Sequence, residues 1–307
     1  MSSPFGRFRD RVVASMTGVE LRALLVGLRE SLERLERANE RAEADIAYLR
    51  RRLTAKTRVL RDKRDHIHEL VQGLEAVRRT PEYAFAYAEA EPLVTVRIAS
   101  YQRTRELMQI ALPSIFAQTY PRIEVVIVND GPNPAARDAI EQLADPRVRY
   151  EEFAVRHEYP DDAHSRWMVA GSPGMNRAAE LATGSWIAPL DEDDAFTPDH
   201  IEKLVALALD SRSELAYGAL VQRNVITGSE ALIWSDPPAI SQFSFQAAIY
   251  NAALGSVFSY DTESWLVDEP GDWNLIRRMA AAGVTMTSTT DVVAVVNHVP
   301  YTHKDES

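Results

Sequence analysis

Four consecutive acidic residues, Asp191-Glu192-Asp193-Asp194, follow a short apolar segment that ends at Leu190. Because alternate side chains of an extended chain point the same way, Asp191 and Asp193 are expected to face one site. Two carboxylates held close together repel each other unless a cation lies between them. Mg²⁺ or Mn²⁺ bound in this way commonly takes phosphate oxygens as further ligands. The alternative is a solvated turn that caps the next helix, and the pattern by itself does not decide between the two.

Polar side chains also follow two other apolar segments. Ser100 and Tyr101 come just after the first, and Asn129 and Asp130 come just after the second. The predicted strands are residues 93–98, 123–128, 148–153 and 186–190, and the predicted helices between them are residues 104–118, 134–143 and 175–182. Strands that alternate with helices are typical of a parallel sheet covered on both faces, in which ligands bind beyond the carboxyl ends of the strands. We therefore expect an α/β domain whose polar clusters meet in one crevice.

These segments together resemble family 2 of the glycosyltransferases, whose members adopt the GT-A fold. The stretch VTVRIASYQRTRELMQIALPSIFAQTYPRIEVVIVNDG (94–131) is similar to the family's first strand, helix and second strand. GMNRAAELATGSWIAPLDEDDAF (174–196) is similar to the helix and strand that lead into its D-x-D-D signature. GDWNLIRRMAAAG (271–283) is similar to the helix start that supplies its catalytic base. The resemblance covers about residues 92–300.

The resemblance implies an inverting, metal-dependent transfer of a sugar from a nucleotide-diphosphate sugar to a hydroxyl acceptor, either a saccharide or a glycoconjugate. It favours UDP- or dTDP-linked donors and Mn²⁺ or Mg²⁺ as cofactor. The nucleotide-binding residues that it implies are Ser100, Tyr101, Asn129, Asp130 and Asp191; the metal ligands are Asp193, Asp191 and His298; the catalytic residue is Asp272. Asn129 departs from the family's usual aspartate, which leaves the identity of the base open.

The assignment of Asp272 as general base agrees with the chemistry of inversion. An acceptor hydroxyl that attacks the anomeric carbon opposite the diphosphate must lose its proton, so a carboxylate is needed across from the metal. The alternative is that Asp272 caps the helix that begins there. His298 follows the last predicted strand, residues 292–296, and is either a metal ligand or a structural histidine.

A polar stretch, residues 156–174, and the region 220–265 are less informative. Loops at the strand ends of such sheets often carry specificity, and Trp167 in the first stretch can either stack on a sugar or pack internally. The second region is expected to form the acceptor side. Its aromatic and amide residues are Trp234, Phe243, Phe245, Tyr250, Asn251 and Tyr260.

Composition separates the chain into a basic and an acidic part. Residues 1–80 hold 18 Lys and Arg against 12 Asp and Glu, whereas the remainder holds 16 against 33. A part this acidic is unsuited to binding nucleic acid through its phosphates. The chain has no cysteine, which excludes disulfides and thiolate chemistry, and neither a signal peptide nor a membrane-spanning segment is evident. We expect a cytoplasmic protein.

A heptad repeat occupies residues 21–77, and no proline lies between Pro4 and Pro81. One seam holds Leu25, Leu32, Asn39, Ile46, Leu53, Leu60, Ile67 and Leu74; the other holds Leu21, Leu28, Leu35, Ala42, Leu49, Lys56, Lys63, Leu70 and Val77. A sustained repeat of this kind predicts a coiled coil and hence a homo-oligomer, and a lone seam asparagine favours a parallel dimer. A long amphipathic helix packed on its own domain is the alternative.

The expected domains are an N-terminal segment (1–17), a coiled-coil helix (18–80), a linker (81–91) and a GT-A domain (92–307). The first segment interleaves Phe5 and Phe8 with arginines, which is typical either of a frayed terminus or of a helix that contacts anionic lipid at the membrane surface.

Two other functions compete with glycosyl transfer. A nucleotidyltransferase of related fold would need a glycine-rich signature near the first strand, and residues 97–105 (RIASYQRTR) contain no glycine. A non-catalytic scaffold with a degenerate transferase domain is the other alternative. The joint presence of Asp191, Asp193 and Asp272 argues against degeneration.

Overall fold

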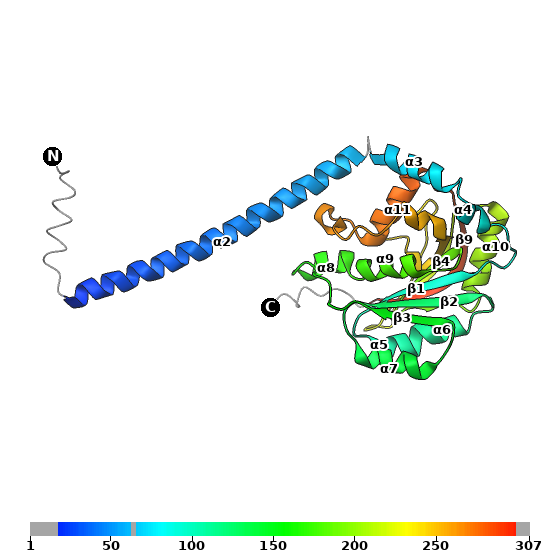
Figure 1. The fold of residues 1–307 in the computed structure, drawn as a ribbon, viewed down its shortest axis with the longest axis horizontal. Coiled ribbons are helices and arrows are strands. Elements are labelled where there is room, and N and C mark those ends of the chain that lie inside the picture. The colour runs from blue at the N-terminus through cyan, green and yellow to red at the C-terminus, as the bar shows by residue number, and fades with distance from the viewer. Residues whose placement is uncertain (1–17, 63–65, 299–307) are drawn as a thin grey trace. The chain divides into compact units, whose positions relative to one another are not determined.

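The structure is a computed structural model that describes residues 18–62 and 66–298, in two units, 1–55 and 56–307. The described part of the first unit belongs to one long helix, α2 (Gly18–Asp62), seen in blue in Figure 1. Its heptad leucines, such as Leu25 and Leu32 (both 57% exposed), are open to solvent in the single chain. No described helix is long and apolar enough to cross a membrane.

Residues 66–91 differ from the coiled coil and linker expected there. Helix α3 (His66–Val77) buries its seam residues Leu70 and Leu74 against α11 (Gly271–Ala282) in an apolar cluster of the second unit. Helix α4 (Pro81–Phe85) follows, and Ala86 behind it is buried and accepts a hydrogen bond from Nε1 of Trp186. These residues belong to the globular unit because their apolar side chains find partners there.

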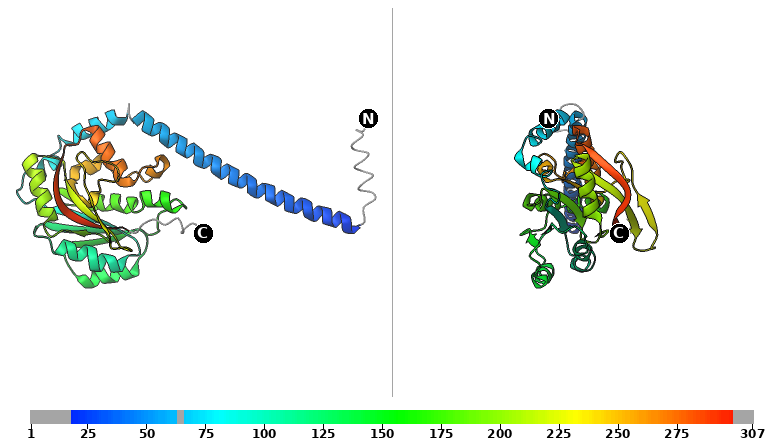
Figure 2. Two further views of the ribbon diagram at one scale, coloured as in Figure 1. Left: turned by 180° about the vertical axis from the view of Figure 1, so that it is seen from behind. Right: turned by 90° about the vertical axis from the view of Figure 1, so that its right-hand side faces the viewer.

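A mixed sheet forms the centre of the second unit, with nine strands among the described residues in the order β3-β2-β1-β4-β8-β6-β9-β5, and with β7 on β6. Strands β3, β2, β1 and β4 are parallel, as the sequence predicts. Beyond β4 the sheet becomes mixed, because β8 is antiparallel to both β4 and β6 whereas β9 runs parallel to β6. Figure 2 shows β9 in red as a long curved strand. The strands are β1 (Val94–Ser100), β2 (Ile123–Asn129), β3 (Val148–Glu152), β4 (Trp186–Asp191), β5 (Ala195–Phe196), β6 (Leu215–Asn224), β7 (Glu230–Ile233), β8 (Ala248–Asn251) and β9 (Met286–His298).

Helices cover both faces of the parallel strands. Val125 and Ile127 of β2 pack in the cluster that includes Leu112 of α6, whereas Val126 and Val128 pack on α9 from the opposite face. This alternation explains why β2 is apolar at nearly every position. The covering helices are α5 (Thr104–Glu106), the π-helical turn η1 (Leu107–Ala111), α6 (Leu112–Phe116), α7 (Pro134–Leu143), α9 (Ser172–Leu181) and α10 (His200–Ser211).

The predicted helix 104–118 is a continuous helix over 104–116 with one widened turn. Pro113 has no N–H, and its ring would clash with the carbonyl four residues earlier in a regular α-helix. The chain relieves this clash with a π turn, in which the N–H of Leu112 bonds the carbonyl of Leu107.

The register of the parallel strands aligns their polar ends. Ser100 of β1 pairs with Asn129 of β2, and Ala99 pairs with Asp191 of β4. The three polar clusters predicted from the sequence therefore lie at one edge of the sheet, which confirms the expected convergence. Two short helices, α8 (Ala163–Val169) and η2 (Phe245–Ala247), lie near this edge. In contrast, η3 (Ala252–Ser256) follows β8 at the opposite end of β4, and η4 (Ser264–Val267) packs on α8.

Candidate active site

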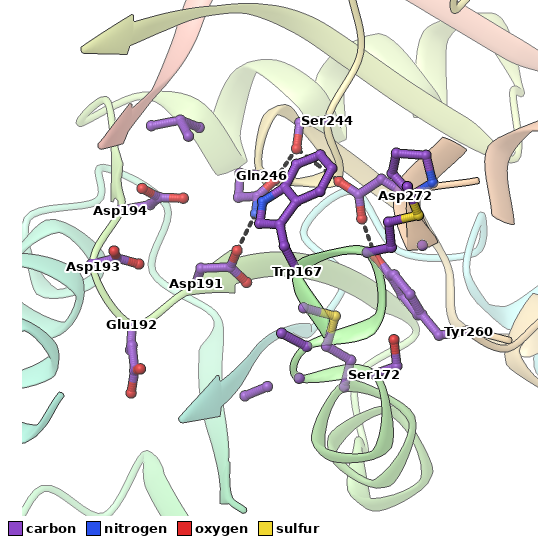
Figure 3. A pocket seen from close by; sticks show the side chains of 18 of the residues that line it. Trp167, Ser172, Asp191, Glu192, Asp193, Asp194, Ser244, Gln246, Tyr260 and Asp272 are labelled. Atoms are coloured by element: carbon purple, nitrogen blue, oxygen red, sulfur yellow. Dashed lines mark hydrogen bonds between the residues drawn. The ribbon is translucent and has the colours of Figure 1, made fainter. Parts of the chain in front are cut away.

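A cavity of about 760 Å³ opens at this edge of the sheet (Figure 3). It is lined by most of the site residues expected from the sequence: Ser100, Tyr101, Asp130, Asp191, Asp193, Asp272 and His298. Asn129 is the exception. Its side chain is buried and does not line the cavity. The side-chain amide donates a hydrogen bond to the carbonyl of Gly131 and so holds the loop after β2.

Each acidic residue of the turn after β4 has a different partner. Glu192 accepts hydrogen bonds from Ser100 Oγ and, at 2.9 Å, from the backbone N–H of Tyr101, so it ties the end of β4 to the end of β1. Asp193 forms an ion pair with Arg103, and Asp191 accepts from Gln246. All four acidic residues line the cavity, and Glu192 in addition holds the backbone of the turn against the end of β1.

The last residues of β9 close the other side of this turn. The N–H of Asn297 donates to Asp194 at 2.7 Å, and the amide of Asn297 donates to the carbonyl of Asp193. This contact brings the next residue, His298, to the cavity that Asp193 lines. The sequence-based placement of His298 beside the acidic turn is consistent with this geometry.

Burial and mutual repulsion raise the pKa values of the carboxyl groups in this acidic turn. Burial raises the pKa of Glu192 to about 7. Burial and the negative charge of Asp272 raise the pKa of Asp191, and burial and the charge of Asp191 raise that of Asp194. A divalent cation would relieve this repulsion, and carboxylate oxygens are the ligands that Mg²⁺ and Mn²⁺ prefer, so the donor set fits such an ion. Within residues 18–62 and 66–298, no three His, Asp or Glu side chains lie close enough to hold a metal by themselves.

Asp130 holds the segment after β3 in place. Its Oδ1 lies 2.8 Å from Nδ1 of His157, and its Oδ2 accepts from the hydroxyl of Tyr159 at 2.7 Å. The guanidinium of Arg156 stacks 4.0 Å from the centre of the Tyr101 ring. The polar stretch 156–174 thus folds over the end of β2 and contributes Arg156, Tyr159 and Trp167 to the cavity.

Asp272 is fixed by three donors. Tyr260 donates to its Oδ1 at 2.8 Å, while Ser244 Oγ (2.8 Å) and the backbone N–H of Phe245 (3.2 Å) donate to its Oδ2. Asp272 is the second residue of α11, and Pro270 occupies the capping position. The helix-capping alternative is therefore wrong for this side chain, whose hydrogen bonds all come from other elements.

The expected acceptor region divides into wall and interior. Phe243 and Tyr260 line the cavity, as do Ser244 and Gln246. Phe245, Tyr250 and Asn251 are buried in the core instead. Sequence reasoning missed Arg103, Ser244 and Gln246, since a polar residue in an irregular segment carries no periodic signal that separates a site residue from a surface one.

Residues 95–262, more than half of the chain, match the family model described as glycosyl transferase family 2. The chain belongs to that family. Its mixed α/β sheet with polar strand ends is the GT-A fold expected from the sequence.

Curated relatives and solved structures agree with this placement. An uncharacterized glycosyltransferase of Nostoc sp. is 28% identical over 174 residues, which cover 56% of this chain and 47% of the relative. The UDP-Glc:alpha-D-GlcNAc-diphosphoundecaprenol beta-1,3-glucosyltransferase WfaP of Escherichia coli is 27% identical over 151 residues, which cover 48% and 53%. The chain thus spans about half the length of these relatives. S. aureus TarS 1-349, solved in complex with UDP-GlcNAc, has a TM-score of 0.54 at 15% identity, covering 70% of this chain and 61% of that one. This last likeness concerns the fold.

Proposed function

We propose that this chain is an inverting, metal-dependent glycosyltransferase that moves a sugar from a nucleoside-diphosphate donor to a hydroxyl acceptor. One observation carries the proposal. A chain of this family places an acidic pair, Asp191 and Asp193, and a separate, firmly held carboxylate, Asp272, around one cavity. Figure 3 shows Asp193 and Asp272 on opposite sides of the view with Asp191 between them.

The acidic turn supplies the metal side of this site. Asp193 and Asp191 would hold Mn²⁺ or Mg²⁺ with help from His298, and diphosphate oxygens would complete the shell. Such an ion would neutralise the charge that develops on the departing diphosphate. Arg103 now pairs with Asp193 and is about half exposed, so it can turn toward solvent or toward a phosphate when the carboxylate binds the metal.

Asp272 supplies the base. Each carboxylate oxygen has two lone pairs, and Oδ1 accepts one protein hydrogen bond, so it can still accept a proton. The acceptor oxygen forms a bond to the anomeric carbon as the bond from that carbon to the diphosphate breaks. The hydroxyl proton passes to Asp272, and the nucleoside diphosphate leaves. Attack from the face opposite the leaving group inverts the configuration.

The remaining walls suit the two substrates. Ser100, Tyr101 and Asp130 would bind the nucleotide, together with Asp191, and Trp167 and Phe243 would contact the sugars. We propose a UDP-sugar as donor, with a dTDP-sugar as the second choice, because WfaP is a UDP-Glc-dependent glucosyltransferase and TarS 1-349 was solved in complex with UDP-GlcNAc. The acceptor would be a saccharide or a glycoconjugate.

Donor hydrolysis and nucleotide binding test the proposal together. We expect the full chain with Mn²⁺ to release UDP from UDP-Glc or UDP-GlcNAc, and Asp272→Asn to lower that rate by about 10²–10⁴-fold, the range for a lost general base. Asp193→Ala should abolish the metal-dependent rise in melting temperature that UDP produces. Asp138→Asn, an exposed acid on α7, is the matched control. Full activity of Asp272→Asn would contradict the proposal, and UDP binding by an inactive wild type would favour a scaffold.

We further propose that α2 forms a parallel homodimeric coiled coil. The exposed leucines of its two seams support this assembly, since a lone amphipathic helix would leave them in water. The proposed lipid contact of residues 1–17 lies outside the described residues. The absence of cysteine is compatible with the proposed cytoplasmic location.

A further inference from the structure

A buried arginine interrupts the apolar core strand β1. Arg97 is 1% exposed, and its neighbours Val96 and Ile98 are completely buried. A guanidinium without ionic partners in such a place costs several kcal/mol, since water can no longer solvate the charge. An apolar side chain of similar volume would pack there at no such cost, so the charge must be balanced by something nearby.

Arg97 interacts with two tyrosines, Tyr250 and Tyr260. Its Nη2 donates to the hydroxyl of Tyr260 at 3.1 Å, and its guanidinium carbon lies 5.0 Å from the centre of the Tyr260 ring. Among the described residues, no carboxylate forms an ion pair with Arg97, and its Nε has no hydrogen-bond partner. The positive charge therefore interacts with two tyrosine hydroxyls, and Tyr260 is the one that also contacts Asp272.

The hydroxyl of Tyr260 connects Arg97 to Asp272 through two hydrogen bonds. This hydroxyl accepts from Arg97 and donates to Asp272 Oδ1 at 2.8 Å, so the three side chains form a continuous chain from the core to the cavity wall. Asn176 of α9 fixes the backbone of Tyr260 through hydrogen bonds of 2.8 and 3.0 Å to its N–H and carbonyl. Tyr260 is therefore held both at its backbone, by Asn176, and at its hydroxyl, by Arg97 and Asp272.

We propose that Arg97 and Tyr260 are positioning residues that orient the Asp272 carboxylate for proton abstraction, an inference that rests on the proposed role of Asp272 as base. A hydroxyl polarised by a buried cation donates a stronger hydrogen bond to a carboxylate than a free phenol does. That bond fixes the rotation of the carboxylate about its axis, while Ser244 and the N–H of Phe245 hold the other oxygen. Because the carboxylate cannot rotate, the remaining lone pair of Oδ1 points in one fixed direction.

The charge of Arg97 also has a reason in this location. Asp191 and Asp272 repel each other, and Arg97 favours the ionised form of Asp191 against that repulsion. A cation inside the sheet favours the charged form of Asp191 without lining the cavity.

The test compares variants that remove one link at a time. Tyr260→Phe removes only the hydroxyl, Arg97→Met removes the charge at similar volume, and Arg97→Lys keeps the charge. Tyr120→Phe is the matched control, because it also removes one buried tyrosine hydroxyl, which donates to the carbonyl of Pro92 outside the cavity. The assay is release of UDP from UDP-Glc and UDP-GlcNAc with Mn²⁺, with kcat and KM measured separately, UDP affinity by calorimetry and the melting temperature.

We expect Tyr260→Phe and Arg97→Met each to lower kcat by about 10–100-fold, because misplacing a reacting group costs rate rather than substrate binding. The KM and the UDP dissociation constant should stay within about twofold of wild type. The double variant should lose little more than the worse single variant, since the two residues act in one chain. Arg97→Lys should recover part of kcat, and Tyr120→Phe should match wild type.

Several results would overturn the proposed positioning role of Arg97 and Tyr260, which is called the relay below. Wild-type kcat in Tyr260→Phe alongside an inactive Asp272→Asn would refute the relay and leave the proposed function intact, whereas an active Asp272→Asn would refute the function itself. Equal losses in kcat, UDP affinity and melting temperature would show a structural role only. If wild type releases no UDP from either donor, a crystal structure of Tyr260→Phe decides, and an unchanged Asp272 side chain in it overturns the proposal.

Discussion

Arg78 and Glu214 form an ion pair with two parallel hydrogen bonds, from Nε to Oε1 at 2.6 Å and from Nη2 to Oε2 at 2.8 Å. Arg78 comes just after α3, and Glu214 immediately precedes β6. Tyr83 and the N–H of Thr285 also donate to this carboxylate, which is 1% exposed. Glu214 thus joins the segment that enters the globular unit to the sheet.

Removing the charge of Glu214 should destabilise the second unit. Glu214→Gln leaves Arg78 facing a neutral amide that cannot accept all of the existing bonds, and breaking a largely buried pair costs about 3–5 kcal/mol, toward the low end here because Arg78 is one-third exposed. Urea unfolding measures the loss. Arg79→Ala is the control, since Arg79 pairs with Glu75 on the surface, and it should change stability by less than about 0.5 kcal/mol. Equal effects of the two variants would contradict this account.

The same carboxylate predicts how stability depends on pH. Burial alone would raise the pKa of Glu214, but hydrogen bonds from Arg78 and Thr285 outweigh it and lower the pKa below the ordinary 4.5. The folded state therefore holds this proton less tightly than the unfolded state. The stabilisation is present above about pH 4.5 and is lost as the pH falls through the folded pKa.

A comparison with Glu214→Gln isolates this contribution from the other acids. We expect the difference in unfolding free energy between wild type and variant to be constant from pH 7 to about pH 5 and to shrink below pH 4.5, because the glutamine does not titrate. Urea midpoints at a series of pH values give the curve. A difference that does not change between pH 7 and pH 3 would show that another interaction accounts for the stability.

Asp130 should act on both the nucleotide and the segment 156–174. In Asp130→Ala, His157 and Tyr159 lose their shared partner, so the segment should open more often and be cleaved faster by a protease. UDP affinity should fall about tenfold, which corresponds to about 1.4 kcal/mol. Calorimetry and limited proteolysis measure the two effects, with the exposed Asp138→Ala as control. If UDP binding weakens but the rate of cleavage does not change, Asp130 contributes to nucleotide binding and does not hold the segment 156–174.

The parallel half of the site follows from the sequence, and the physical reason is local. Apolar strands that end in polar residues place those residues at one edge, whichever helices cover them, so Ser100 and Asp191 could be located from the pattern alone. Glu192 was not separable from its acidic neighbours in this way. Its role depends on the parallel register that sets the end of β1 beside the end of β4.

The antiparallel half depends on contacts between distant residues. Tyr260 and Gln246 lie in irregular segments, so their orientation toward Asp272 and Asp191 follows only from the packed structure. The heptad pattern was ambiguous for a related reason. Leucines at seam spacing can pack on a partner helix or on their own domain. Leu70 and Leu74 pack on their own domain. Leu25 and Leu32 are exposed in the single chain and are therefore available to pack on a partner helix.

The proposed coiled coil therefore predicts self-association through α2 alone. Leu28→Lys combined with Leu35→Lys places charges in the seam and should convert a dimer into a monomer, because unpaired seam charges oppose helix pairing. Glu30→Lys introduces the same charge at an exposed position outside both seams and should leave the dimer intact. Sedimentation equilibrium of the full chain measures the mass. A monomeric wild type would refute the coil, whereas a dimer that survives the double substitution would place the interface elsewhere in the chain.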